Sequence, residues 1–208
     1  MTEKELRHQI TEVGQRLYAA RLAVAKSGNI SARLDAENIL ITATGTFPGQ
    51  LNDSDIVKVN LASGKYEGEI KPSSELPLHI LVYKNFPAKV TVHCHPPLIN
   101  GYFAVANNLK AMNFETKFYL GDIPVIPQET PTVTSPEPVI AALKTNNLVV
   151  LKNHGTVAIA DKFQDALSIT EALEEAVKST ALARLFDKDI LDDLDMALKE
   201  DLKYDQPA

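Results

Sequence analysis

The chain has 208 residues, a length typical of one large α/β domain, which we expect to span residues 1–208. Its 45% hydrophobic and 23% charged residues, with no apolar run as long as a membrane span, argue against an integral membrane protein. The net charge of -6 argues against a nucleic-acid partner, because phosphate backbones bind clustered lysine and arginine, but a small phosphorylated ligand remains compatible with it. The single cysteine excludes an internal disulfide and, with an N-terminus that lacks the apolar core of a signal peptide, predicts a cytoplasmic protein.

The N-terminal part of the chain contains one predicted helix followed by three predicted strands. Apolar residues recur at helical spacing over residues 2–27, and Gly28 is a plausible end for that helix. Two runs that favour strands, residues 29–34 and 38–43, predict a hairpin, and residues 57–61 predict a third strand. The sequence leaves open whether the helix belongs to the core or to an oligomer contact.

Two segments have features of an anion-binding site. The turn at residues 42–46 is rich in threonine and glycine, and such turns expose backbone N–H groups that can hold an anion, although most of them are only turns. A helix is predicted to begin within residues 71–79, where either of two serines, Ser73 and Ser74, can cap it. The free N–H groups and positive dipole end of a first turn can bind phosphate, with help from Lys71 and the two serines.

Glu75 and His79 belong to this same helix start. Glu75 is either a first-turn carboxylate that the helix dipole favours or a base that faces a metal site, and on its own the first interpretation is the simpler. His79 follows four residues later, near the same helical face, and a role in packing is expected for it.

A histidine pair, His93 and His95, lies in the stretch of residues 90–97. Side chains two apart on a strand point to the same side, roughly 6.6–7 Å apart. The two imidazoles therefore face one side, opposite the apolar residues between and before them, and can converge on one cation. Two prolines end the strand directly afterwards, so the pair lies at a strand terminus, where a site is expected. The pair alone is a weak signal, because buried histidines with ordinary hydrogen bonds are common.

The rest of the chain alternates helices and strands around a loop-rich segment. The predicted helices are residues 98–108, 135–146 and 162–185, the predicted strands are residues 148–152 and 156–160, and the loop-rich segment is residues 110–134. His154 lies between the two strands, again at a strand end, beside a glycine that lets the backbone turn tightly.

Five short motifs together resemble the class II aldolase/adducin family, and within it the sugar-phosphate aldolases of the L-fuculose-phosphate aldolase type. The motifs are Gly-Asn-Ile-Ser-Ala-Arg at 28–33, Thr-Gly at 44–45, Lys-Pro-Ser-Ser-Glu at 71–75, His-Cys-His at 93–95 and Asn-His-Gly at 153–155. Each motif is unspecific alone, but their order and rough spacing agree with the family over residues 5–187.

The resemblance implies a metal-dependent active site. One divalent ion per subunit, usually Zn²⁺ with Mn²⁺, Co²⁺ or Fe²⁺ as other options, would be held by His93, His95 and His154. Glu75 matches the family's catalytic acid/base. The implied phosphate contacts come from Asn29, Thr44, Gly45, Ser73 and Ser74.

The implied reaction is the cleavage of a ketose 1-phosphate into dihydroxyacetone phosphate and an aldehyde. The substrate would bind the metal through its carbonyl and adjacent hydroxyl, and the metal would stabilise the enediolate that appears when the C–C bond breaks. Glu75 would move the proton on and off this enediolate.

The aldehyde side departs from the family pattern. The bacterial aldolases use a tyrosine downstream of the second metal-binding histidine, and the corresponding position here is close to Phe114, which cannot donate a proton. Tyr119 and Tyr102 are candidate replacements. Tyr204, in the tail, is the candidate for a second family tyrosine that comes from a neighbouring subunit.

Other functions stay open. A dehydratase, such as a methylthioribulose-phosphate dehydratase, or a decarboxylase would use the same metal-bound enolate. Pentulose-phosphate epimerases usually carry aspartate after the paired serines, so Glu75 favours the aldolase branch. A non-catalytic adducin-like module is a different class, and the intact histidine set argues against it, because a scaffold has no reason to keep buried polar groups aimed at one point.

The resemblance further implies a homotetramer with sites at subunit interfaces, and a three-layer α/β/α fold with a largely antiparallel central sheet. The alternation of helices and strands agrees with a layered α/β protein but does not distinguish parallel from antiparallel order.

Overall fold

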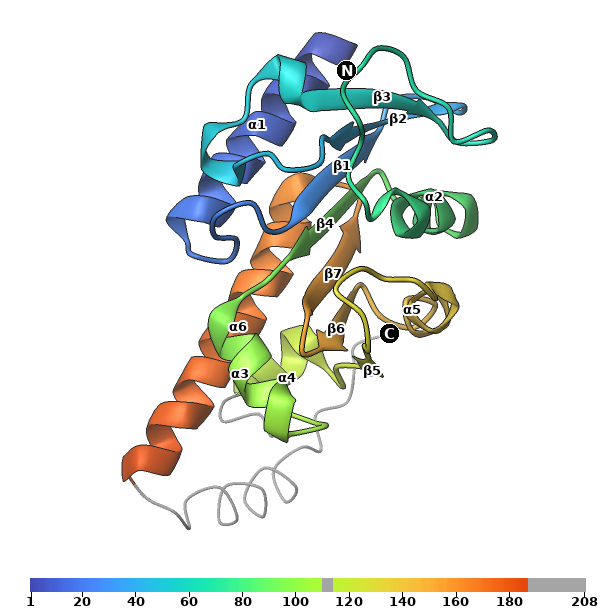
Figure 1. Ribbon diagram of the computed structural model, residues 1–208. Coiled ribbons are helices and arrows are strands. Elements are labelled where there is room, and N and C mark those ends of the chain that lie inside the picture. The colour runs from blue at the N-terminus through green and yellow to red at the C-terminus, as the bar shows by residue number, and fades with distance from the viewer. Residues whose placement is uncertain (110–113, 187–208) are drawn as a thin grey trace, which may run out of the picture.

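A central sheet organises the protein, of which a computed structural model describes residues 1–109 and 114–186 (Figure 1). Within these residues the sheet has seven strands in the order β3-β2-β1-β4-β7-β6-β5. The strands are β1 (Asn29–Arg33), β2 (Asn38–Thr42), β3 (Ile56–Asn60), β4 (Val90–Cys94), β5 (Val125–Pro127), β6 (Leu148–Lys152) and β7 (Gly155–Ala160). Neighbours pair antiparallel except β5 and β6, which are parallel, so the predicted largely antiparallel sheet is confirmed.

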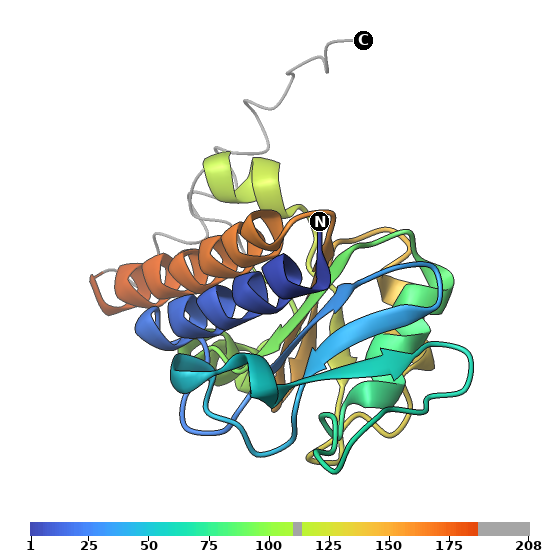
Figure 2. The same ribbon diagram turned by 90° about the horizontal axis from the view of Figure 1, so that it is seen from above.

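Helices cover both faces of this sheet. They are α1 (Glu3–Ala19), α2 (Leu76–Asn85), α3 (Pro97–Val105), α4 (Phe114–Leu120), α5 (Glu137–Ala142) and α6 (Phe163–Phe186), with short 3-10 turns η1 (Pro48–Gln50) and η2 (Asp53–Asp55). Helices α1 and α6 lie side by side on one face, and α2 and α5 lie on the other (Figures 1 and 2). The predicted three-layer α/β/α fold is therefore confirmed. No helix in the described ranges combines the length and apolarity needed to cross a membrane.

The alternation of side chains along β4 shows how the two faces are filled. Val92 and Cys94 are fully buried in the apolar cluster that includes residues of α1 and α6, such as Ile10 and Leu173. Since successive strand residues point to opposite faces, His93 faces the layer of α2 and α5. The predicted separation of the histidine from the apolar residues of this strand is confirmed.

The first helix begins as its sequence predicts but ends much earlier. A capping box starts α1: the Glu5 N–H donates to Thr2 Oγ1 at 3.3 Å, and the Thr2 N–H donates to Glu5 Oε2 at 2.8 Å. The expectation that this helix continues to residue 27 is wrong, because it ends at Ala19. Arg21 and Ala25 take left-handed backbone conformations, with φ of 59° and 51°.

The reason for this early end is a tertiary contact. The loop after α1 turns back toward the sheet and buries Leu22, which is 2% exposed. The carbonyl of Leu22 accepts the backbone N–H of His95 at 2.9 Å. A helix continued past Ala19 would carry Leu22 away from the end of β4, so the burial of Leu22 and of the following Ala23 overrides the helical periodicity.

The segment after α3 also differs from its prediction. The helix expected at residues 98–108 ends at Val105, and the one expected at 135–146 covers only α5. The segment of residues 110–134 was expected to be loop-rich, yet it contains α4 and β5. Strand β5 owes its extended form to pairing with β6, a contact that the local sequence does not contain.

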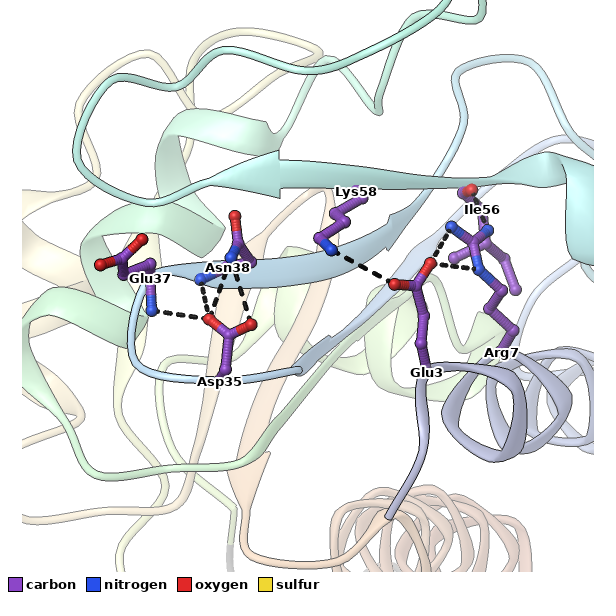
Figure 3. Close-up of polar contacts among 7 residues, drawn as sticks. All are labelled: Glu3, Arg7, Asp35, Glu37, Asn38, Ile56 and Lys58. Carbon is purple, nitrogen blue, oxygen red and sulfur yellow. Dashed lines mark hydrogen bonds and ion pairs between the residues drawn. The ribbon is translucent and has the colours of Figure 1, made fainter.

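Polar contacts close the β1–β2 hairpin and dock α1 on the neighbouring strand β3 (Figure 3). Asp35 closes the β1–β2 turn by accepting the backbone N–H groups of Glu37 and Asn38, both at 2.8 Å. From α1, Arg7 donates to the carbonyl of Ile56 at the start of β3 at 2.5 Å. Asp35 thereby fixes the turn that joins β1 to β2, and Arg7 fixes α1 against the start of β3.

Candidate active site

Several strands end on the same side of the sheet, and there they form a cleft of about 170 Å³. Antiparallel pairing brings the start of β1 beside the end of β4, so Asn29 lies directly opposite His93. All nine residues predicted for metal binding, phosphate binding and acid/base chemistry line this cleft: Asn29, Thr44, Gly45, Ser73, Ser74, Glu75, His93, His95 and His154. Residues as distant in the chain as Asn29 and His154 therefore share one cavity.

The three imidazoles gather at one point. Their ring centroids are 4.7 Å apart for His93 and His95, 4.9 Å for His93 and His154, and 4.8 Å for His95 and His154. Candidate ligand atoms of the three lie within 4.8 Å of one another. Three nitrogen donors of this kind leave a position open on a metal ion, as catalytic zinc sites do. The cluster can thus hold a divalent cation.

The hydrogen bonds of His93 determine which of its nitrogens is free. Its Nδ1 lies 2.9 Å from the carbonyl oxygen of Thr156, and since a carbonyl only accepts, Nδ1 carries the proton. The lone pair is therefore on Nε2, which lies 2.9 Å from Nε2 of His95. A backbone carbonyl that orients an imidazole in this way is typical of metal-binding histidines.

His154 is presented by a tight turn between β6 and β7. Asn153 has a left-handed φ of 62°, and a Cβ on Gly155 would lie 2.2 Å from the carbonyl oxygen of Cys94. The side chain of Asn100 on α3 donates to the carbonyl of His154 at 3.0 Å. Within the described residues the buried Nδ1 of His154 has no hydrogen-bond partner. The His154 ring thus lies beside the two other imidazoles and has one buried nitrogen that no described protein group satisfies, and leaving such a nitrogen without a partner or ligand is costly.

Burial keeps all three histidines neutral. It lowers the pKa of His95 to about 4, with a further contribution from His154. Burial, followed by the neighbouring imidazoles, lowers the pKa of His93 well below its usual value, and burial also lowers the pKa of His154. Metal ligation requires neutral imidazoles, so these shifts favour binding of a cation at neutral pH.

Glu75 stands at the start of α2 and is 4% exposed. Its two carboxylate oxygens accept the backbone N–H of Val133 at 3.1 and 3.2 Å, and its own N–H donates to Ser73 Oγ at 3.2 Å. Burial raises the pKa of Glu75, and the hydrogen bond from Val133 offsets part of that rise. A carboxyl group with a raised pKa is suited to exchange protons near neutral pH.

The two segments suspected of binding an anion lie side by side. A bridge between Ala43 and Pro72 joins them, and the Thr44 N–H donates to the carbonyl of Lys71 at 3.0 Å. Gly45 has a φ of 74° with open space around it, so the turn can approach a ligand closely. Lys71 is exposed and is not among the described residues that line the cleft, so its suggested side-chain role at this site gains no support.

Several lining residues were missed at the level of the sequence. They are Lys26, Ser27, Pro131 and Thr132. Lys26 is the one cationic side chain among the described residues that line the cleft, and its Nζ lies 5.1 Å from the ring centroid of Phe47. Lys26 could have been predicted from the sequence, because it lies close to Asn29 in the chain. Residues 131 and 132 lie too far along the chain for any local pattern to indicate them.

Among the described residues, Tyr102 and Tyr119 are not in the lining of this cleft. Tyr119 is 69% exposed and lines a different cleft, between α4 and α6, with Ile159 and Ala172. The hydroxyl of Tyr102 donates to the carbonyl of Asn108 at 3.2 Å. Tyr204 lies outside the described residues. The suggested role of Tyr119 on the aldehyde side therefore stays a prediction.

Comparisons with known proteins match this sequence and this fold. The family model described as class II aldolase and adducin N-terminal domain matches residues 8–181. The L-fuculose phosphate aldolase of Methanococcus vannielii is 30% identical over 173 residues, covering 83% of this chain and 93% of that protein. The 3-oxo-tetronate 4-phosphate decarboxylase of Escherichia coli is 28% identical over 183 residues, covering 85% and 86% respectively. The crystal structure of the L-fuculose-1-phosphate aldolase from Thermus thermophilus matches with a TM-score of 0.78 and 28% identity, covering 88% of this chain and 96% of that one.

Proposed function

Because the chain belongs to the class II aldolase and adducin family, we propose that it is a metal-dependent aldolase that cleaves a ketose 1-phosphate into dihydroxyacetone phosphate and an aldehyde. The observation that supports this most directly is the convergence of three neutral imidazoles, a buried carboxyl group and an anion-binding type of turn in one small cleft.

The proposed cofactor is one divalent ion per subunit, held by His93, His95 and His154. Zn²⁺ suits three neutral nitrogen donors best, while Mn²⁺, Co²⁺ and Fe²⁺ are alternatives. When bound, such an ion polarises a carbonyl group and stabilises negative charge on its oxygen as a neighbouring C–C bond breaks. The unpartnered Nδ1 of His154 and the free Nε2 of His93 support this assignment.

The residues of this chain would bind and protonate the substrate. The Thr44 N–H is already donated to the carbonyl of Lys71, so the Thr44 hydroxyl, the backbone N–H of Gly45 and the side chains of Ser73 and Ser74, all in the lining of the cleft, would bind a phosphate group. Asn29 would donate to the same group from the start of β1. Glu75 would deliver a proton to the carbon that loses its bond partner and remove it in the reverse direction.

A decarboxylase of a phosphorylated sugar acid is the second candidate. One relative is named as a 3-oxo-tetronate 4-phosphate decarboxylase. Decarboxylation releases CO₂ and requires no proton donor for an aldehyde oxygen. The exposed Phe114 stands near the position where a tyrosine was expected, and Tyr119 lines a different cleft, so this single-chain arrangement is compatible with such a reaction.

The test is a substrate panel on the metal-loaded protein. Release of dihydroxyacetone phosphate from ketose 1-phosphates supports the aldolase, and release of CO₂ from 3-oxo-tetronate 4-phosphates supports the decarboxylase. Loss of water without C–C cleavage supports a dehydratase. A protein that cannot bind Zn²⁺ or Mn²⁺ stoichiometrically would contradict all three and favour a non-catalytic adducin-like module.

We also infer that residues 1–208 form one domain, that the protein is a cytoplasmic homotetramer, and that its partner is a small phosphorylated sugar. Association is supported by apolar side chains that lie open on one chain: Val105, Phe118 and Leu185 are 85%, 84% and 81% exposed. Light scattering of the purified protein tests the tetramer.

A further inference from the structure

A line of buried hydrogen bonds lies directly behind the cleft. His79 on α2 is fully buried. Its Nε2 lies 2.5 Å from Asn29 Oδ1, and its Nδ1 lies 2.6 Å from Ser31 Oγ. Ser31 Oγ in turn lies 2.8 Å from the hydroxyl of Tyr83, which is also on α2. Asn29, at one end of this line, is the member that lines the cleft.

The chemistry of the groups gives the line a single direction. An amide oxygen only accepts, so Nε2 of His79 must donate its proton to Asn29. A neutral imidazole has one N–H, so Nδ1 must accept, and the hydroxyl of Ser31 must donate to it. Ser31 Oγ can then accept the proton of Tyr83. Each member donates toward the cleft.

Burial holds His79 in one protonation state. It lowers the pKa of His79 to about 3, so the ring is neutral at physiological pH and keeps a single N–H. The tautomer with the proton on Nε2 is the one that both neighbours can satisfy.

We propose that His79 is a positioning residue that orients the Asn29 carboxamide, so that its NH₂ group is presented to the cleft as a donor for an anionic ligand. The Asn29 amide nitrogen makes no hydrogen bond found within the described residues, and Asn29 stands opposite His93 in the sheet. Without a donor on its oxygen, the amide could turn over and present that oxygen, which repels an anion. The inference rests on the proposed function in one respect, that the cleft binds a phosphate group.

The first test compares two variants by titrating metal-loaded protein with inorganic phosphate. His79→Leu removes the donor, and His79→Gln keeps a side-chain N–H in its place. We expect the leucine variant to bind phosphate roughly tenfold or more weakly, as for the loss of a hydrogen bond to a charged group, and the glutamine variant to recover most of this loss. With a phosphorylated substrate the same change should raise KM far more than it lowers kcat. Equal binding by the leucine variant would overturn the proposal.

A double-mutant cycle separates positioning from a general structural role. If His79 acts through Asn29, His79→Leu costs nothing further in an Asn29→Ala background, to within about twofold in phosphate affinity. If instead the fold-losses of phosphate affinity in the two single variants multiply in the double variant, His79 acts independently of Asn29 and the proposal is overturned. Tyr83→Phe is the matched control, because it removes a buried hydroxyl of the same line without changing the direction of the bond from His79, and it should leave phosphate affinity unchanged.

A measurement on the unaltered protein covers the case in which the leucine variant does not fold. Nitrogen NMR of ¹⁵N-histidine-labelled protein should show His79 neutral with the proton on Nε2, and a proton on Nδ1 would overturn the proposal. Undetectable phosphate binding by the unaltered protein would overturn it too. Phosphate binding that depends on His79, in a protein that turns over no phosphorylated substrate, would instead sustain this inference and refute the lyase function.

Discussion

The carboxylate of Glu75 accepts the backbone N–H of Val133 with both of its oxygens, at 3.1 and 3.2 Å, across 58 positions of sequence. This hydrogen bond holds a buried carboxyl group in one place at the wall of the cleft. A single N–H only partly replaces the water that burial removes, which is why the pKa of Glu75 stays raised.

Glu75→Gln should slow turnover by a large factor and stabilise the fold at neutral pH. Because burial raises the pKa of Glu75, the folded state holds this proton more tightly than the unfolded state does. The free energy of unfolding therefore falls as the pH rises from the usual value of 4.5 through the raised pKa. Glutamine still accepts the Val133 N–H but carries no charge, so it avoids this loss. Loss of a general acid/base typically costs about 10²–10⁴-fold in rate.

Urea unfolding of metal-free protein between pH 4 and pH 8 checks the stability part of this prediction. The free energy of unfolding of the variant should increase relative to that of the unaltered protein as the pH rises, and at pH 7 the variant should be the more stable of the two. An unaltered protein that is the more stable of the two at pH 7 would contradict it.

Removal of the metal should lower the melting temperature, and His154→Ala should remove that difference. A ligand at a hundred times its Kd stabilises a protein by about 2.7 kcal/mol. His8→Ala is the control, because this histidine is exposed on α1, where its Nε2 lies 3.5 Å from Glu12. Since burial lowers the pKa of each of the three histidines proposed as ligands, metal affinity should decline only below the ordinary imidazole value of 6.5. Calorimetry with and without a chelator measures the shift, and stoichiometric metal in His154→Ala would refute the site.

Gly155→Ala should be strongly unfavourable, whereas Gly101→Ala should be harmless. The added Cβ at residue 155 would lie 2.2 Å from the carbonyl oxygen of Cys94, a backbone atom that cannot move aside cheaply. Overpacking of this kind costs about 1–3 kcal/mol, and it should also displace His154 and weaken metal binding. Gly101, in α3, has nothing within 4 Å of the corresponding position, and alanine there favours the helix by about 0.5–1 kcal/mol. Equal stability of the two variants would count against this account of the turn.

Glu174→Ala should destabilise the protein and weaken metal binding. From α6, the carboxylate of Glu174 accepts the N–H groups of Leu98 and Ile99 at the start of α3, at 3.1 and 2.9 Å. Loss of a cap of this kind costs about 0.5–2 kcal/mol. Because α3 carries Asn100, which binds the carbonyl of His154, the metal site should loosen as well.

Glu175→Ala is the matched control for this change. The neighbouring carboxylate of Glu175 is exposed and lies 3.3 Å from Lys178 in a surface ion pair, which is worth about 1 kcal/mol at most. Chemical unfolding and metal titration of both variants provide the comparison. A Glu175 variant that loses as much metal affinity as the Glu174 variant would contradict the proposed link between α3 and the site.

Local patterns in the sequence determined the side-chain faces of β4, the first hairpin and the family of this protein. Alternation along residues 90–95 placed the histidine pair on the face opposite the apolar residues of β4, because side-chain direction in a strand depends only on position. The same local reasoning found the hairpin of β1 and β2. The motifs around Asn29, Ser73 and His154 were sufficient to predict the family, and with it the layers and the largely antiparallel sheet that local reasoning left open.

Tertiary structure decided what depends on residues that are distant in sequence. Leu22 ends α1 by packing near the end of β4, and β5 is extended because β6 pairs with it. The hydrogen bond from Val133 to Glu75 and the line from His79 to Asn29 join segments that share no local pattern. The physical reason is the same in each case: burial and hydrogen bonding are satisfied between chain segments, so a residue's role at such a position follows from the neighbours that the fold provides.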